Sequence, residues 1–365
     1  MRVLSVFGTR PEAVKMAPVV KLLKETADVE SRVCVTAQHR QMLDQVLDLF
    51  NITPDYDLDL MREDQSLSQL SASIFTNLEP VLTDFKPNWV LAQGDTTTVA
   101  ITSLLCYYHK IKFGHVEAGL RTHDKWQPFP EEINRRIAGA VADLHFAPTE
   151  WSKNNLLKEG VDPNIIKVTG NTVIDALQFV SKQPEPKEIT NLTNKLATSK
   201  LILVTAHRRE NFGEGMKNIC KALLDLSKEK DVQIVYPVHL NPNVQEPVNR
   251  LLKNVENITL LPPLDYLPLV HLMKHATLIL TDSGGIQEEA PAFGVPTLVL
   301  REVTERPEGV EAGTVKLVGT ETSRIKEEAK RLLDDEAEYQ KMSKAANPYG
   351  DGHASERIIQ ALLNY

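Results

Sequence analysis

Short apolar runs alternate with longer segments of helical character along nearly the whole chain. The runs at 3–7, 89–93, 201–205 and 278–280 have the length and composition of buried strands, and a helix is predicted after each of them. Parallel strands need crossover helices of this kind to connect them. The alternation therefore predicts an α/β protein in which parallel sheets are covered by helices on both faces.

The length of the chain predicts more than one domain. With 365 residues it is long for a single hydrophobic core, so we expect two domains of ordinary size. Predicted strands at 144–147 and 166–169 complete the first of them near Gly170. We place an N-terminal domain at 1–171 and a C-terminal domain at 172–352, and we expect the last helical segment, 353–365, to cross back onto the N-terminal domain.

Residues 281–291 follow an apolar strand directly and begin with a glycine turn. Gly284 and Gly285 allow the backbone to approach a bulky anion, and the free N–H groups at the start of a helix attract negative charge. Glu289 lies four residues after Gly285, on the same helical face, within reach of a ribose hydroxyl pair. The stretch predicts a phosphate-binding turn. The alternative is an ordinary tight connection between a strand and a helix.

Carboxylates follow two of the predicted strands, and another lies at the start of a predicted helix after Pro130. Asp95 follows the strand at 89–93, Glu117 follows the strand at 112–116, and Glu131 comes directly after Pro130. Clustered carboxylates raise one another's proton affinity, so one can act as an acid while its neighbour acts as a base. The alternatives are a helix N-cap for Asp95 and a favourable interaction with the helix dipole for Glu131 or Glu132.

Four cationic or ionisable side chains lie where α/β proteins keep their ligands. Arg10 and Lys15 lie near the start of a helix predicted at 12–25, where a cation opposes the helix dipole unless an anion is bound. His207 and Arg306 follow predicted strands of the C-terminal domain. Together they would neutralise a diphosphate leaving group. The alternatives are solvated surface charges and a structural histidine.

Composition excludes several classes of protein. The net charge of -8, without a sustained basic stripe, argues against a nucleic-acid partner. Three widely spaced cysteines without a CxxC pair predict neither a disulfide framework nor a zinc site, and we expect no metal. No run approaches the roughly 18 apolar residues that a membrane span needs. We expect a cytoplasmic protein with no membrane partner.

Six longer motifs, in order along the chain, carry a specific resemblance. They are FGTRPEA (7–13), GDTTT (94–98), HVEAGLRT (115–122), HRREN (207–211), DSGGIQEEAP (282–291) and TERPE (304–308). In these motifs the chain resembles the bacterial non-hydrolysing UDP-N-acetylglucosamine 2-epimerases. The resemblance implies a GT-B architecture, with two Rossmann-like domains facing across a cleft, and a homodimer. It also implies interconversion of UDP-GlcNAc and UDP-ManNAc, without cofactor, for surface polysaccharide precursors.

The resemblance also assigns roles to individual positions. It implies an elimination of UDP to 2-acetamidoglucal followed by re-addition, with the loop 264–269 on the uracil and a second UDP-GlcNAc as a potential activator. Leu264 departs from the family pattern, in which glutamine is frequent, and Asp64 stands where some regulated members carry a basic residue. The implied positions are catalytic Asp95, Glu117, Glu131 and His207; substrate-binding Arg10, Lys15, Leu264, Leu269, Ser283, Gly284, Gly285, Glu289 and Arg306; and activator-binding Gln38, Gln41, Arg208 and His239.

Three alternative functions share the same nucleotide site. A hydrolysing epimerase would release free N-acetylmannosamine and UDP, and a glycosyltransferase would need a groove for an acceptor. A sugar-nucleotide sensor would bind without catalysis. The three carboxylates argue against the sensor, because a site that only binds an anionic ligand would avoid them.

Overall fold

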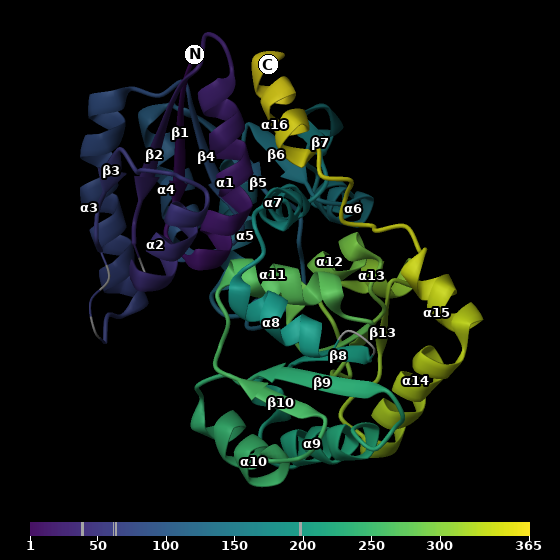
Figure 1. The fold of residues 1–365 in the computed structure, drawn as a ribbon. Helices are drawn as coiled ribbons and strands as arrows, with labels where there is room; N and C mark the ends of the chain where they lie inside the picture. The colour runs from purple at the N-terminus through teal and green to yellow at the C-terminus, as the bar shows by residue number, and fades with distance from the viewer. Residues whose placement is uncertain (38–39, 61, 63, 197–198) are drawn as a thin grey trace. The chain divides into compact units, whose positions relative to one another are not determined.

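The computed structural model of the chain describes residues 1–37, 40–60, 62, 64–196 and 199–365. The chain divides into two compact units: residues 1–179 with 349–365 form unit 1, and residues 180–348 form unit 2. Each unit contains one parallel β-sheet with helices packed around it (Figure 1). The predicted fold class, α/β with two parallel sheets, is therefore confirmed.

Unit 1 is built on a seven-stranded sheet in the order β3-β2-β1-β4-β5-β6-β7. Strands β4 and β6 are buried along their whole length, and β1 and β5 are buried after their first residue, as expected for a parallel sheet covered on both faces. The strands are β1 (Arg2–Phe7), β2 (Glu30–Val35), β3 (Tyr56–Asp57), β4 (Trp89–Gln93), β5 (Lys112–Val116), β6 (Leu144–Ala147) and β7 (Ile166–Val168). The helices of this unit and the linking helix are α1 (Arg10–Glu25), α2 (Arg40–Leu49), α3 (Leu67–Phe85), α4 (Thr97–His109), α5 (Glu131–Val141), α6 (Glu150–Lys158), α7 (Thr172–Ser181) and α16 (Ala354–Leu363).

Unit 2 repeats this architecture with a six-stranded sheet in the order β10-β9-β8-β11-β12-β13. The strands are β8 (Lys200–Thr205), β9 (Val232–Pro237), β10 (Ile258–Leu261), β11 (Leu278–Thr281), β12 (Thr297–Val299) and β13 (Val315–Leu317). The helices are α8 (Lys187–Lys195), α9 (Glu214–Leu226), α10 (Pro242–Leu252), α11 (Tyr266–His275), α12 (Gly284–Glu289), α13 (Pro307–Glu311), α14 (Thr322–Asp334) and α15 (Glu336–Ser343). Its core packs side chains of α9, α10 and α14 against the sheet.

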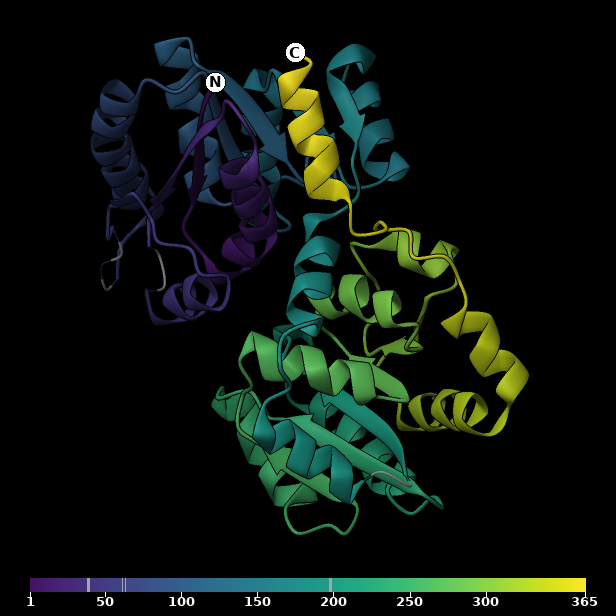
Figure 2. The same ribbon diagram turned by 45° about the horizontal axis from the view of Figure 1, so that its top comes forward.

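The C-terminal segment returns to unit 1 and is fastened there. Helix α16 packs beside α1 (Figures 1 and 2). Its first N–H groups donate to the Asp175 carboxylate of α7, at 3.2 Å from Ala354 and 2.8 Å from Ser355. Before the helix, the backbone N–H of Asn171 donates to the carbonyl of Tyr349 at 2.7 Å. A side chain on another helix thus caps α16, which lacks a side-chain cap of its own.

Some elements differ from those expected from the sequence. Helix α1 begins at Arg10 rather than at 12, because Thr9 is its N-cap and forms a capping box with Glu12. The edge strands β3 and β13 were not expected; each has only two or three residues, too few to show a period. The chain leaves unit 1 near the end of α7, whereas the boundary was expected at its start, 171/172. In the described part of the chain, no helix is long and apolar enough to cross a membrane.

Removal of the Asp175 cap should destabilise unit 1. The substitution Asp175→Ala leaves the first N–H groups of α16 without their acceptor, and a lost cap of this kind costs about 1–2 kcal/mol. The free energy of unfolding in urea measures this loss. Glu356→Ala, on the exposed side of the same helix, is the matched control. Equal losses in the two variants would contradict the capping role.

Two buried histidines should make the native state sensitive to acid. Burial lowers the pKa of His115 to about 4 and that of His145 to about 3. In the unfolded chain both rings take up a proton below about pH 6.5. The free energy of unfolding should therefore fall as the pH drops from 6.5 toward 4, by up to ~1.4 kcal/mol per pH unit for each ring.

Unfolding at pH 7, 6, 5 and 4 measures this slope. The substitution His145→Phe keeps a ring of similar size and removes one titrating group, so it should flatten the slope. His109→Gln, at a partly exposed position, is the control substitution at a histidine outside the core. An undiminished slope in His145→Phe would refute the assignment.

Candidate functional site

The motifs of unit 1 leave neighbouring strands at one edge of the sheet. Strand β4 pairs with β1 on one side and with β5 on the other, all in parallel. The segments after their carboxyl ends, which carry Thr9, Asp95 and Glu117, therefore emerge side by side. In α/β sheets this is the edge where ligands bind.

Glu12 joins the first two of these segments. Its buried carboxylate accepts the N–H groups of Gly8 at 3.0 Å and Thr9 at 2.7 Å, and the hydroxyl of Thr96 at 2.7 Å. Burial raises the pKa of Glu12, although these donors act in the opposite direction. Glu12 was not among the predicted site residues, yet its carboxylate links the turn after β1 to the turn after β4.

Glu117 is held in one orientation by three side chains. Lys15 forms an ion pair with one carboxylate oxygen, and the amide of Asn171 donates to that oxygen at 3.1 Å. The amide of Gln93 donates to the other oxygen. The backbone of Glu117 is left-handed, with φ of 63°. Lys15 thus contacts a catalytic candidate directly, which its expected role at the diphosphate did not anticipate.

Asp95 is bound by an arginine of α5. Two guanidinium nitrogens of Arg135 contact the same carboxylate oxygen, Nη2 at 2.6 Å and Nε at 3.2 Å. Asn134 donates to the Asp95 carbonyl at 2.9 Å. The cap of α4 is Thr96, whose hydroxyl accepts from Val99, so the alternative of an N-cap for Asp95 is wrong. The carboxylate of Asp95 keeps 27% of its side-chain surface exposed.

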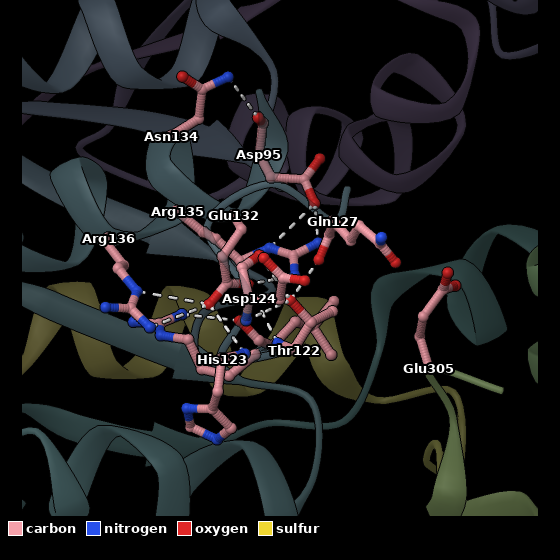
Figure 3. A network of polar contacts seen from close by, with 12 residues as sticks. Asp95, Thr122, His123, Asp124, Gln127, Glu132, Asn134, Arg135, Arg136 and Glu305 are labelled. Atoms are coloured by element: carbon pink, nitrogen blue, oxygen red, sulfur yellow. Dashed lines mark hydrogen bonds and ion pairs between the residues drawn. The ribbon is translucent and has the colours of Figure 1, made fainter. Parts of the chain in front are cut away.

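The two glutamates at the start of α5 have different surroundings. Glu132 is fully buried and accepts the N–H groups of Thr122 at 3.1 Å and His123 at 3.2 Å, as well as both neighbouring arginines (Figure 3). Burial acts to raise the pKa of Glu132, but these N–H donors and the charge of Arg135 lower it overall. Glu131, the predicted catalytic residue, is only partly buried. Glu132 is therefore the structural member of the pair.

Unit 2 organises its motifs around a different buried carboxylate. Asp282 is fully buried and accepts the N–H groups of His207 at 2.9 Å and Arg208 at 2.8 Å, and the amide of Asn211 at 2.9 Å. It thereby joins the end of β11 to the HRREN motif after β8. The rings of His207 and His239 stack with their centroids 5.3 Å apart. Burial lowers the pKa of His207; Arg208 and His239 lower it further, and Asp282 opposes them.

The glycine turn packs against Arg306. Helix α12 begins at Gly284, where a side chain would come within 2.6 Å of the Arg306 guanidinium. That guanidinium also contacts Glu288 at 2.6 Å and Glu305 at 3.1 Å. The turn and the TERPE motif therefore pack directly against each other, and a side chain at position 284 would displace the Arg306 guanidinium.

The remaining predicted positions lie in or near this assembly or at the surface. Glu289 is buried and accepts the hydroxyl of Tyr266 at 3.1 Å, a partner that no sequence motif indicated. Leu264 and Leu269 are partly buried, before and within α11, and Arg208 lies 3.9 Å from Glu305. Arg10 is the first residue of α1 and is partly exposed. Gln38 and the side chain of Gln41 lie outside the described residues.

The candidate site residues of unit 1 and those of unit 2 suit different chemistry. Unit 1 presents carboxylates fixed by cations and amides, which suits proton transfer. Unit 2 presents an arginine, a histidine and a glycine turn, which suits an anionic group. Across the described residues, no cluster of histidine, cysteine, aspartate and glutamate could hold a metal ion.

Comparison with known proteins shows extensive similarity. A family model described as UDP-N-acetylglucosamine 2-epimerase matches residues 21–363. The chain is 58% identical to the UDP-N-acetylglucosamine 2-epimerase of Salmonella typhimurium, over 100% of this chain and 99% of that protein, and 57% identical to that of Escherichia coli K12, with the same coverage. It resembles the crystal structure of UDP-GlcNAc 2-epimerase from Neisseria meningitidis bound to UDP-GlcNAc, with a TM-score of 0.90, 52% identity and full coverage of both chains.

The surroundings of His207 predict opposite effects of two substitutions. Asp282→Asn removes the negative charge beside the ring, so the pKa of His207 should fall further. Arg208→Gln removes a positive charge, so the pKa of His207 should rise. NMR titration of the ring protons measures both shifts. Shifts of the same sign, or none, would contradict the proposed arrangement of charges.

Proposed function

Because this chain belongs to the UDP-N-acetylglucosamine 2-epimerase family, we propose that it interconverts UDP-GlcNAc and UDP-ManNAc and keeps UDP bound until the sugar is restored. The observation that carries the proposal is the set of carboxylates at the strand ends of unit 1. Asp95 and Glu117 are each held by a cation, and Glu131 begins the helix that also carries Arg135. The Neisseria meningitidis relative bound to UDP-GlcNAc supports the choice of substrate.

The chemistry of the sugar explains why the reaction needs elimination. The hydrogen on carbon 2 has no adjacent carbonyl, so direct removal of that proton would be very slow. If the bond between carbon 1 and the UDP oxygen breaks first, the developing positive charge acidifies the proton on carbon 2. A carboxylate takes this proton, a double bond forms between carbons 1 and 2, and the products are 2-acetamidoglucal and UDP.

Re-addition completes the epimerisation. A different acid returns a proton to the opposite face of carbon 2, and the UDP oxygen attacks carbon 1 again. We assign the proton transfers to Asp95, Glu117 and Glu131, because two faces of the sugar require at least two groups. Arg10, His207 and Arg306 neutralise UDP with Ser283, Gly284 and Gly285, and Lys15 supports Glu117. Glu289 contacts the ribose, and the segment with Leu264 and Leu269 contacts the uracil.

Further properties follow from the family resemblance and belong to the same proposal. They are a homodimer, a cytoplasmic location and a product used in surface polysaccharide synthesis. A second UDP-GlcNAc would act as an activator through Arg208, His239, Gln38 and Gln41. The stacked rings of His207 and His239 support this last point, because they place a predicted activator contact against a predicted catalytic side chain.

Incubation with UDP-GlcNAc in deuterated water tests the reaction. NMR follows the reaction. We expect intact UDP-ManNAc with deuterium at carbon 2, formed without an acceptor. Glu117→Gln should lower kcat by at least ~100-fold, the scale of a lost general acid or base. Glu79→Gln, at an exposed position on α3, is the control. Free N-acetylmannosamine would indicate the hydrolysing alternative, and no exchange would indicate a sensor.

A further inference from the structure

One buried ion cluster connects all three segments that carry the proposed catalytic carboxylates. Arg135 is 9% exposed and contacts Asp95 after β4, while its Nη1 contacts Glu132 of α5 at 3.0 Å. Glu132 in turn accepts the N–H groups of the loop that follows Glu117 (Figure 3). The cluster therefore reaches the end of β4, the loop after β5 and the start of α5, next to Glu131.

We propose that Arg135 and Glu132 are the positioning residues of the reaction, and that they hold Asp95 in the orientation in which it exchanges a proton with the sugar. This inference rests on the proposed function and adds residues that need not contact the substrate.

Geometry argues that Arg135 acts on orientation and not only on charge. Nη2 and Nε converge on a single oxygen of Asp95, Oδ2. A planar guanidinium that is fixed at its other nitrogen can hold the carboxylate in this way, whereas the single ammonium of a lysine cannot. Among the described residues, Arg135 engages only Oδ2, so the other carboxylate oxygen, Oδ1, can take a proton from the substrate.

Glu132 fixes the guanidinium from the opposite side. Its fully buried carboxylate would be costly without donors, and it receives two backbone N–H groups and two arginines. If Arg135 rotated away from Asp95, the buried negative charge of Glu132 would therefore lose one of its positively charged partners. His115 also senses this arginine, because its pKa is lowered mainly by burial and further by Arg121 and Arg135.

The adjacent Arg136 supplies a matched control. It contacts the same Glu132, through Nη2 to Oε1 at 3.3 Å, but 42% of its side chain is exposed, and no contact with Asp95 is described. A purely structural role of the cluster would make the two arginines similar. A positioning role predicts that only Arg135 affects the chemical step.

The test compares Arg135→Ala with Arg136→Ala in the deuterium-exchange assay. For Arg135→Ala we expect kcat to fall about 100-fold with KM changed less than about threefold, because a displaced catalytic group of this kind costs about that factor. Added guanidinium ion should restore part of kcat. Arg136→Ala should retain kcat and KM within about threefold and should not respond to guanidinium. Circular dichroism and UDP affinity establish that each variant is folded.

Arg135→Lys and Arg136→Lys cover the case in which the alanine variant does not fold. Lysine keeps the charge and the aliphatic stem, so Arg135→Lys should fold and bind UDP while kcat still falls at least about tenfold. Normal kcat in Arg135→Lys, or equal losses at positions 135 and 136, would overturn the inference. Absence of carbon-2 exchange in the unmodified enzyme would instead overturn the proposed function, so the two failures are distinguishable.

Discussion

A carboxylate that leaves water must be matched by donors, and this requirement shapes both functional regions of the chain. Glu12, Glu132 and Asp282 are each buried, and each takes backbone N–H groups from a loop that carries a motif. Glu12 and Glu132 link the segments around the proposed catalytic carboxylates, and Asp282 links the glycine turn to His207. The residues that link these segments are therefore themselves acidic, and one of them, Glu132, directly follows Glu131, which is proposed to react.

Much of this arrangement could be predicted from the sequence. The alternation of strands and helices predicted two parallel sheets, and the parallel arrangement placed Asp95 and Glu117 at one edge. Local chemistry could not separate Glu131 from Glu132, because both occupy the first turn of one helix, where any acidic residue is favourable. Their burial separates them, and burial depends on Thr122 and His123, about ten residues away.

Other features depended on contacts between segments far apart in the chain. Lys15 was predicted to bind the diphosphate of the ligand, but it forms an ion pair with Glu117, which follows it by 102 residues. Asp175 occupies the first turn of α7, and its partners at the start of α16 come 179 and 180 residues later. No periodicity or local propensity encodes such pairs. Edge strands as short as β3 escape prediction for a related reason, since a neighbouring strand defines them.

The return of residues 349–365 to unit 1 has a consequence for biosynthesis. Unit 2 is inserted between two pieces of unit 1, and α16 is translated after every residue of unit 2. Every residue of unit 2 is therefore translated before the helix that packs beside α1 and binds Asp175. Unit 1 is thus begun first and receives its last helix only after all of unit 2 has been made.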